Sequence, residues 1–176
     1  FKDLWYSSFP SIYNLSAGTH KLFCDARLDW AFTKIQSKSD WDVLELGPLE
    51  GGHSYWLEKN TNVRSITAIE ANQLCWLKCL ITKEVVDLKN TKYLLGDFIE
   101  FLKDTEKGYD LILALGVLYH MKNPLELLQC IAEATERVVI WTQFADTDKQ
   151  KDWQKITVKY KDLKIDDMRD KWTTII

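Results

Sequence analysis

Hydrophobic and polar positions follow two different periods along residues 42–142. Short, nearly continuous apolar runs alternate with longer segments in which apolar residues recur every three or four positions. Runs of the first kind predict buried strands, and the longer spacing predicts amphipathic helices. The predicted strands cover residues 42–46, 65–70, 91–97, 109–116 and 137–142.

Helix-start signals precede two of the longer segments. Asn72 is placed to cap a helix that extends to about Leu88. Four apolar residues are expected on one side of that helix: Leu74, Leu77, Ile81 and Val85. Asn123, Pro124 and Glu126 supply the cap, the first-position proline and the third-position acid of another helix.

Strands that alternate with helices are typical of an α/β fold with right-handed crossovers. We therefore predict a doubly wound, mostly parallel sheet between two layers of helices. Ligands of such sheets bind beyond the carboxyl ends of the strands. The residues that directly follow each strand are therefore the candidate site residues.

The first forty residues depart from this pattern. Their aromatic residues come first, at Trp5, Tyr6, Phe9 and Tyr13. A helix is then predicted from about His20 to Lys38, with Thr19 as its cap. Its apolar stripe would contain Leu22, Phe23, Ala26, Trp30 and Ile35. We interpret residues 1–40 as a helical and aromatic segment, either a lid over a site or an arm on the flank of the sheet, and residues 41–176 as the single main domain.

The last 35 residues are less regular. The ranges 155–163 and 172–176 are candidate strands, and the segment between them is polar. The final apolar triplet fits a strand end or a protein that continues further. The lysines from Lys149 to Lys164 alternate with aspartates, which favours a solvated face over a nucleic-acid surface.

Composition and charge narrow the classes of function. The 176 residues, 46% of them hydrophobic, suffice for one substantial core. The net charge is -3, and residues 41–141 carry 10 basic and 15 acidic side chains. A surface that holds a polynucleotide usually has a basic excess, so nucleic acid is disfavoured as the main partner. No apolar run is long enough to span a membrane and the N-terminus has no signal pattern, so we expect a cytoplasmic protein.

The four cysteines form no disulfide or metal pattern. Cys75 and Cys79 share a face of a predicted helix, but the three histidines, at positions 20, 53 and 120, are scattered along the sequence. We therefore interpret the cysteines as reduced, mostly buried thiols and expect no metal; they are Cys24, Cys75, Cys79 and Cys130.

A glycine loop, VLELGPLEGGHS at residues 43–54, connects the first strand to a short helix expected from Ser54. A dinucleotide-binding turn needs glycine at its third position, but in the turn that begins at Gly47 this position is Leu49. Glu50 adds a negative charge, which also disfavours a phosphate ligand. No Lys-Ser or Lys-Thr pair follows, which excludes a P-loop. An ordinary strand-to-helix turn and a loop for another nucleoside ligand both remain.

Acidic residues lie at or beside the ends of three successive strands. Glu45 precedes the glycine loop, and Glu70 ends the second strand, where a carboxylate can accept from both hydroxyls of a ribose. Asp97 follows the third strand beside Phe98, a pair suited to the amino group and the ring face of adenine. With the glycine loop, this arrangement favours a ligand that joins an ammonium and a carboxylate to a nucleoside, as S-adenosylmethionine does.

These stretches resemble known motifs. ELGPLEGG (45–52) is similar to the E-x-G-x-x-x-G motif of class I S-adenosylmethionine-dependent methyltransferases, AIEAN (68–72) to their ribose-binding turn, and GDF (96–98) to their adenine-binding turn. GVLYHMKNPLELL (116–128) most closely resembles the segment after the fourth strand in tRNA wobble-uridine carboxymethyltransferases. The resemblance covers about residues 42–142.

The resemblance implies a Rossmann-like fold whose full sheet has seven strands with an antiparallel last strand, of which five are readable here. It implies S-adenosylmethionine as cofactor and S-adenosylhomocysteine as product. It also implies the cofactor-binding residues, which are Glu45, Gly47, Pro48, Gly51, Gly52, His53, Glu70, Ala71, Asp97, Phe98, Leu115 and Gly116.

Methyl transfer needs mainly position, and a base where the acceptor loses a proton. His120, beside Tyr119 beyond the fourth strand, is the candidate base; the alternative is a histidine that orients the loop or contacts the cofactor. His53 is interpreted as a contact of the loop or helix start rather than a catalyst. The expected walls of the acceptor pocket are Trp141, Gln143 and Phe144.

Charge and size favour a small-molecule acceptor, such as a sugar-like group, with a reactive oxygen or nitrogen. Three alternatives remain: a tRNA methyl- or carboxymethyltransferase, a nicotinamide oxidoreductase, which Leu49 disfavours, and a non-catalytic module that binds S-adenosylmethionine. The sequence does not indicate an oligomeric state.

Overall fold

A computed structural model of the chain describes residues 4–35, 40–105 and 108–143. Its centre is a five-stranded, wholly parallel sheet with the order β3-β2-β1-β4-β5. The strands are β1 (Trp41–Leu46), β2 (Val63–Glu70), β3 (Thr91–Leu95), β4 (Leu111–Leu115) and β5 (Val138–Trp141). All five predicted strands are present, each within two residues of its predicted bounds.

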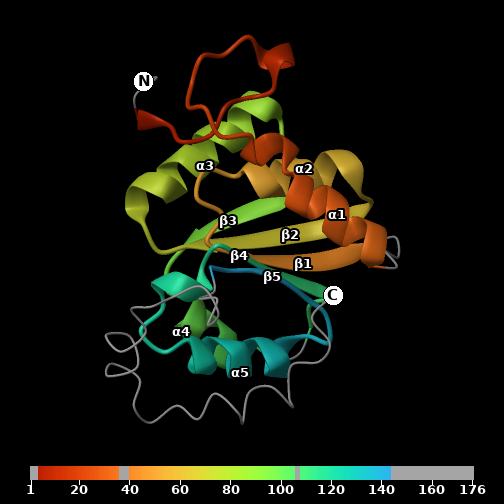
Figure 1. The fold of residues 1–176 in the computed structure, drawn as a ribbon, viewed down its shortest axis with the longest axis vertical. Helices are drawn as coiled ribbons and strands as arrows, with labels where there is room; N and C mark the ends of the chain where they lie inside the picture. Colours follow the sequence, from red (N-terminus) through yellow and green to blue (C-terminus); the bar gives the residue numbers. More distant parts are fainter. Residues whose placement is uncertain (1–3, 36–39, 106–107, 144–176) are drawn as a thin grey trace, which may run out of the picture.

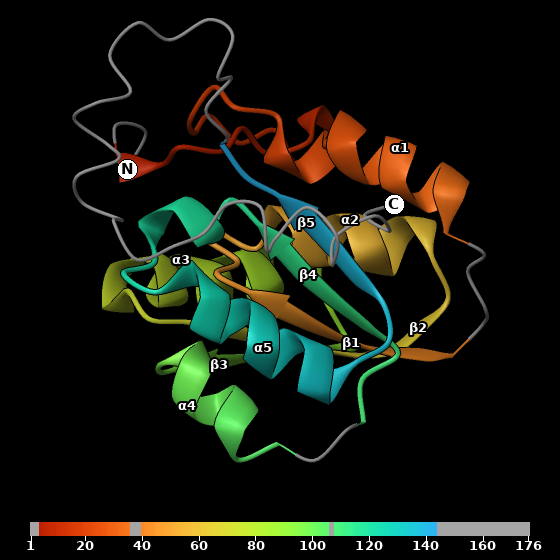
Figure 2. The ribbon, with the colours of Figure 1, turned by 60° about the horizontal axis from the view of Figure 1, so that its bottom comes forward.

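Helices cover both faces of the sheet (Figure 1). On one face lie α1 (Ala26–Lys34), α2 (Gly52–Asn60) and α3 (Gln73–Val86); on the other lie α4 (Phe98–Lys103) and α5 (Pro124–Ala134). The predicted three-layer, doubly wound α/β fold is therefore confirmed. The chain leaves β1 toward one face and β4 toward the other, and these two strands are neighbours, as Figure 2 shows. In sheets of this kind, such a switch point opens a crevice at the carboxyl ends of the strands.

The core forms two layers because alternate residues of each strand face opposite sides of the sheet. Every residue of β4 is buried, and Ile112 and Leu113 are both 0% exposed. Ile112 packs in the cluster beneath α4 and α5, whereas Leu113 packs in the cluster beneath α1 and α2. Burial on both faces explains why the strands appear in the sequence as continuous apolar runs.

The helix caps expected from local sequence are present. Asn72 accepts hydrogen bonds from the backbone amides of Leu74 and Cys75, at 2.9 and 3.1 Å. Asn123 accepts from the amide of Glu126 at 3.3 Å, and Pro124 begins α5. These side chains satisfy amides that have no partner inside the helix.

The four apolar residues predicted on one side of α3 face solvent. Their exposed fractions run from 38% to 54%, in the order Val85, Ile81, Leu77 and Leu74. The helix packs on the sheet through a different side, which contains Cys79, Thr82 and Val86. Apolar spacing therefore predicted the helix but not the side that it buries.

The prediction for the N-terminal helix was wrong about its start. The helix α1 begins at Ala26 and Asp25 is its cap, while residues 22–24 form one 3-10 turn. His20 cannot begin a helix because its backbone pairs with the first residues: its amide donates to the carbonyl of Tyr6 at 3.0 Å and its carbonyl accepts from Ser8 at 2.8 Å. Trp30, expected in the buried stripe, is 59% exposed.

Some predictions fall outside the described residues. These are the candidate strands at 155–163 and 172–176, the lysine-rich stretch from Lys149 to Lys164, and Phe144. In the part of the chain that the structure describes, no helix combines the length and the apolar character of a membrane span.

Candidate cofactor and acceptor site

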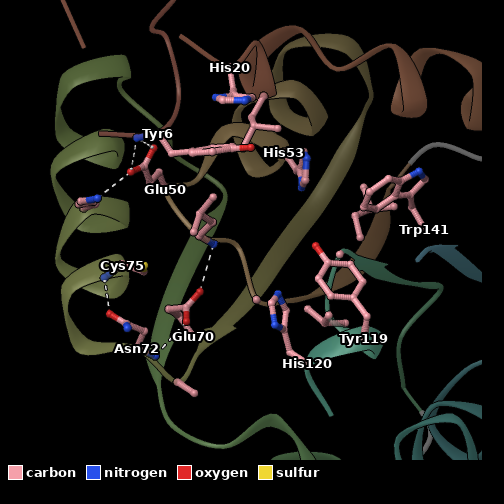
Figure 3. Close-up of a pocket in the computed structure, with 18 of the residues that line it drawn as sticks. Tyr6, His20, Glu50, His53, Glu70, Asn72, Cys75, Tyr119, His120 and Trp141 are labelled. Carbon is pink, nitrogen blue, oxygen red and sulfur yellow. Dashed lines mark hydrogen bonds and ion pairs between the residues drawn. The ribbon is translucent and has the colours of Figure 1, made fainter. Parts of the chain in front are cut away.

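A cavity of about 1060 Å³ opens at the carboxyl ends of β1, β2, β4 and β5 (Figure 3). Ligand pockets in proteins usually measure about 300–1,000 Å³, so this space is large enough for two ligands side by side. Nine of the predicted site residues line it: Gly47, His53, Glu70, Ala71, Phe98, Leu115, Gly116, Tyr119 and His120.

Glu70 is the acidic residue most clearly prepared for a ligand. It ends β2 and is 8% exposed. One carboxylate oxygen accepts from the amide of Leu49 in the glycine loop at 3.1 Å, and the other accepts from the amide of Asn72 at 2.9 Å. Each oxygen keeps a second acceptor site. The carboxylate is thus fixed in place while retaining the capacity to accept from two neighbouring hydroxyls.

Two glycines follow the neighbouring strands at the switch point. Gly47 has φ +66° and Gly116 has φ +87°, a left-handed backbone that glycine adopts without strain. A Cβ atom on Gly47 would lie 2.7 Å from Cγ1 of Val117, and one on Gly116 would lie 3.1 Å from the hydroxyl of Tyr119. Glycine at both positions avoids a side chain that would crowd Val117 and Tyr119, which line the cavity.

Gly51 and Gly52, at the end of the same loop, do not line the cavity. A Cβ on Gly51, whose φ is +80°, would lie 2.6 Å from the hydroxyl of Tyr93. A Cβ on Gly52 would lie 2.8 Å from the backbone carbon of Leu22. These two glycines allow close packing of the loop on its neighbours. The sequence motif alone does not show whether a glycine serves such packing or contacts a ligand.

Three further predicted residues are absent from the cavity wall: Glu45, Pro48 and Asp97. Glu45 is 1% exposed, accepts a hydrogen bond from the hydroxyl of Ser54 and faces Nδ1 of His53 across 3.4 Å. Asp97 is exposed and caps α4, accepting from the amide of Ile99 at 2.8 Å. Glu45 therefore lies behind the cavity wall, next to His53, which lines the cavity.

A buried charge network that sequence reasoning missed connects the glycine loop to α1. Nε2 of His53 lies 3.0 Å from Oδ2 of Asp25, and Asp25 also forms a two-pronged ion pair with the Arg27 guanidinium. Burial lowers the pKa of His53, but its bonds to Asp25 and Glu45 outweigh that effect and raise it above its ordinary value. For Asp25 the two effects have the opposite sign: burial raises its pKa, but the bonds to His53 and Arg27 hold it far below its usual range.

Aromatic and imidazole side chains form the wall that continues beyond Glu70 toward β5. His120 lies between Glu70 and Tyr119 in Figure 3, and the Tyr119 and His120 ring centroids are 4.3 Å apart. Tyr119 meets Trp141 edge-on at 6.2 Å, and the Arg27 guanidinium lies 4.5 Å from the centre of the Trp141 ring. Trp141, the last residue of β5, and Gln143, just after that strand, also line the cavity.

The aromatic residues near the N-terminus divide between the cavity and the core. Trp5 and Tyr6 line the cavity, together with His20, which sequence reasoning had not selected. Phe9 and Tyr13 instead pack against the cluster that contains Phe23 and Tyr55. The segment therefore contributes side chains both to the cavity wall and to the core.

The cysteines are unpaired in the structure: Cys79 and Cys130 are buried, Cys75 is half-buried and Cys24 is exposed. Among the described residues, no group of three or more His, Cys, Asp or Glu side chains is placed to hold a metal ion.

Comparison with known proteins places the fold in a family. A family model described as "Methyltransferase domain" matches residues 17–167. A tRNA U34 carboxymethyltransferase of Pseudoalteromonas atlantica is 30% identical over 107 residues, which is 58% of this chain and 32% of that protein. A probable (S)-tetrahydroprotoberberine N-methyltransferase 2 of Papaver bracteatum is 30% identical over 108 residues, 60% of this chain and 26% of that protein.

Solved structures agree in fold. The N-terminal domain of EvdMO1 with S-adenosylhomocysteine bound has a TM-score of 0.65 at 23% identity, over 78% of this chain and 60% of that one. Coclaurine N-methyltransferase, bound to N-methylheliamine and S-adenosylhomocysteine, has a TM-score of 0.53 at 26% identity, over 65% of this chain and 34% of that one. The chain spans about a third or less of the two curated relatives named above. Since the family model matches most of the sequence, the chain belongs to the methyltransferase-domain family, within the class I S-adenosylmethionine-dependent methyltransferases.

Proposed function

We propose that this chain binds S-adenosylmethionine and transfers its methyl group to an oxygen or nitrogen of a small-molecule acceptor. The observation that carries the proposal is the Glu70 carboxylate, held at the end of β2 by the amides of Leu49 and Asn72. It faces a cavity at the switch point of the sheet with one acceptor site free on each oxygen.

The residues present fit the cofactor. Glu70 would accept from the two ribose hydroxyls, and the buried Phe98 beside it would cover one edge of the adenine. Gly47 and Gly116 leave space between these groups and the opposite wall, because neither has a Cβ that would project into the cavity. A volume of about 1060 Å³ leaves space for an acceptor beside the cofactor.

The bound cofactor supplies the electrophile, a methyl group on a sulfonium. The chain's own residues bind and orient the two partners and exclude water from the space between them. His120 takes the proton that the acceptor loses, on a ring nitrogen, and the adjacent Tyr119 hydroxyl holds the acceptor by a hydrogen bond. Trp141 and Gln143 complete the acceptor side of the cavity.

A small acceptor is favoured because the site is a cavity rather than a basic surface. The segment 41–141, which supplies most of its lining residues, carries 10 basic and 15 acidic residues. A polynucleotide would need a basic surface to neutralise its phosphates. The second candidate acceptor is tRNA, favoured by the 30% identity to a tRNA U34 carboxymethyltransferase. Retention of the chain on tRNA at physiological salt would support that second candidate.

Calorimetric titration with S-adenosylhomocysteine tests the cofactor. We expect binding in the micromolar range, and no heat with either S-adenosylmethionine or its product would refute the proposal. Incubation with methyl-labelled S-adenosylmethionine and fractionated small molecules then tests transfer. Tight cofactor binding without transfer to any fraction would identify a binding module instead of an enzyme.

A further inference from the structure

Glu50 is a fully buried carboxylate in the glycine loop, 0% exposed, and its partners lie outside that loop. Its two oxygens accept from the amide of Tyr6 at 3.0 and 3.1 Å, and one also accepts from the amide of Ser7 at 2.7 Å. The ammonium of Lys78 on α3 lies 2.7 Å away. One side chain thus joins the N-terminal segment, the glycine loop and α3, and Figure 3 shows these bonds beside the cavity.

The segment that Glu50 holds, residues 6–8, is itself paired with residues 18–20. Ser7 forms a parallel bridge with His20, the amide of Ser8 donates to the carbonyl of His20 at 2.8 Å, and the amide of Gly18 donates to the carbonyl of Ser7 at 3.0 Å. A Cβ on Gly18 would lie 2.2 Å from the backbone of Tyr6, so the two stretches are in close contact. Fixing Tyr6 and Ser7 therefore also fixes His20.

Tyr6 and His20 form a stacked pair on the cavity wall. Their ring centroids are 3.6 Å apart and their planes differ by 8°. Figure 3 shows His20 on one side of the Tyr6 ring and the rest of the cavity, with Glu70 and His120, on the other. Tyr6 is nonetheless 50% exposed, so little packing from the core holds it. The hydrogen bonds of its backbone are what set its position.

We propose that Glu50 is a positioning residue for the cofactor: it fixes the Tyr6–His20 pair as the wall that faces Glu70 across the cavity. Glu50 acts through Tyr6 and Ser7 and does not take part in the chemistry. This role rests on the proposed function, because the wall matters only if a ligand binds beside it.

The charge of Glu50 is part of the arrangement. Burial raises its pKa, but the ammonium of Lys78 and the amides of Tyr6 and Ser7 lower it below its ordinary value. The group is therefore ionised at neutral pH and accepts only, which matches its partners, all of them donors. A glutamine has the same shape but would lose the ion pair. Its side-chain amide NH2 group would also face the N–H donors that now bind the carboxylate.

The test uses the full chain with Glu50→Gln and a matched control, Glu58→Gln. Glu58 also accepts from two backbone amides, of Lys89 at 2.9 Å and of Asn90 at 3.0 Å, but it does not line the cavity. S-adenosylhomocysteine affinity is measured by calorimetry. Hydrogen exchange is measured separately for residues 6–8 and for β4. Lys78→Met, which removes the ion pair and the bond from Lys78 to the carbonyl of Leu4 but keeps the amide bonds to Glu50, serves as a milder second variant.

We expect Glu50→Gln to weaken S-adenosylhomocysteine binding by about tenfold or more and to speed exchange at residues 6–8 while β4 stays protected. Glu58→Gln should leave affinity unchanged, and Lys78→Met should show a smaller effect in the same direction. Unchanged affinity in Glu50→Gln, or unchanged exchange at residues 6–8, would overturn the role of Glu50. Failure of the unaltered chain to bind would refute the proposed function, and the exchange data would still decide whether Glu50 fixes Tyr6.

Discussion

Nε2 of His53 lies 3.0 Å from Oδ2 of Asp25, and both side chains are more than nine-tenths buried. The pair joins the first turn of α2 to the cap of α1, and its two residues are 28 positions apart in sequence. Because Glu45 lies on the other side of the imidazole, His53 is buried between two carboxylates, which raise its pKa. The contact therefore ties a helix before the sheet to the loop that shapes the cavity.

We expect the stability that His53 contributes to depend on pH. Its pKa is raised in the folded chain, so its contribution is complete below the unfolded value of about 6.5 and is lost as pH rises through the folded value. His53→Asn should cost about 1–3 kcal/mol of unfolding free energy at pH 6 and less at pH 9. Urea unfolding at both pH values measures this, and an equal cost at both would show that the imidazole is neutral when folded.

Glu70→Gln should weaken S-adenosylhomocysteine binding by about tenfold or more, because a neutral amide accepts weaker bonds from hydroxyls and turns one donor toward the cavity. The amides of Leu49 and Asn72 would also lose one charged acceptor. Calorimetry measures the affinity. An unchanged dissociation constant would contradict the assignment of Glu70 to the ribose.

His120→Asn should lower kcat by about a hundredfold or more and leave the affinity for S-adenosylhomocysteine unchanged, as expected for a base that acts on the acceptor. The measurement needs a turnover assay with the acceptor and a separate binding titration. A loss of affinity as large as the loss of rate would instead identify His120 as a cofactor contact.

Gly51→Ala should destabilise the fold by about 2–4 kcal/mol, because φ is +80° there and the new methyl group would lie 2.6 Å from the hydroxyl of Tyr93. Gly96→Ala is the matched control, since a Cβ at Gly96 has no neighbour within 4 Å. Its effect should stay within about 0.5 kcal/mol. Thermal or urea unfolding separates the two, and equal effects would contradict the packing role of Gly51.

The strands and the caps at Asn72 and Asn123 could be predicted because their signals are local: an apolar run, or an amide acceptor before a helix. The start of α1 could not, because the pairing of Ser7 with His20 is a contact between distant residues that competes with helix formation. Thr19 and Asp25 are both good caps, and only the partners of Asp25, namely Arg27 and His53, decide between them.

In the candidate site too, local sequence predicts some residues, while contacts between distant residues determine others. Glu70 was predictable because its position at a strand end specifies its surroundings. Glu50 was interpreted only as a charge unfavourable to phosphate, since nothing in its neighbourhood indicates that Tyr6, 44 residues earlier, supplies its partner. Arg27 and His20 reach the cavity in the same way, through long-range contacts that no motif describes.

The contact between Glu50 and Tyr6 also has a consequence for the order of folding. It spans 44 residues and needs the glycine loop and α3 already in place, since Lys78 completes it. Contacts of large sequence separation carry a high loop-closure cost and form after local structure. During refolding, the sheet signal should therefore return before the chain regains its affinity for ligand. A ligand-binding probe in a stopped-flow experiment would then report on the last step of assembly.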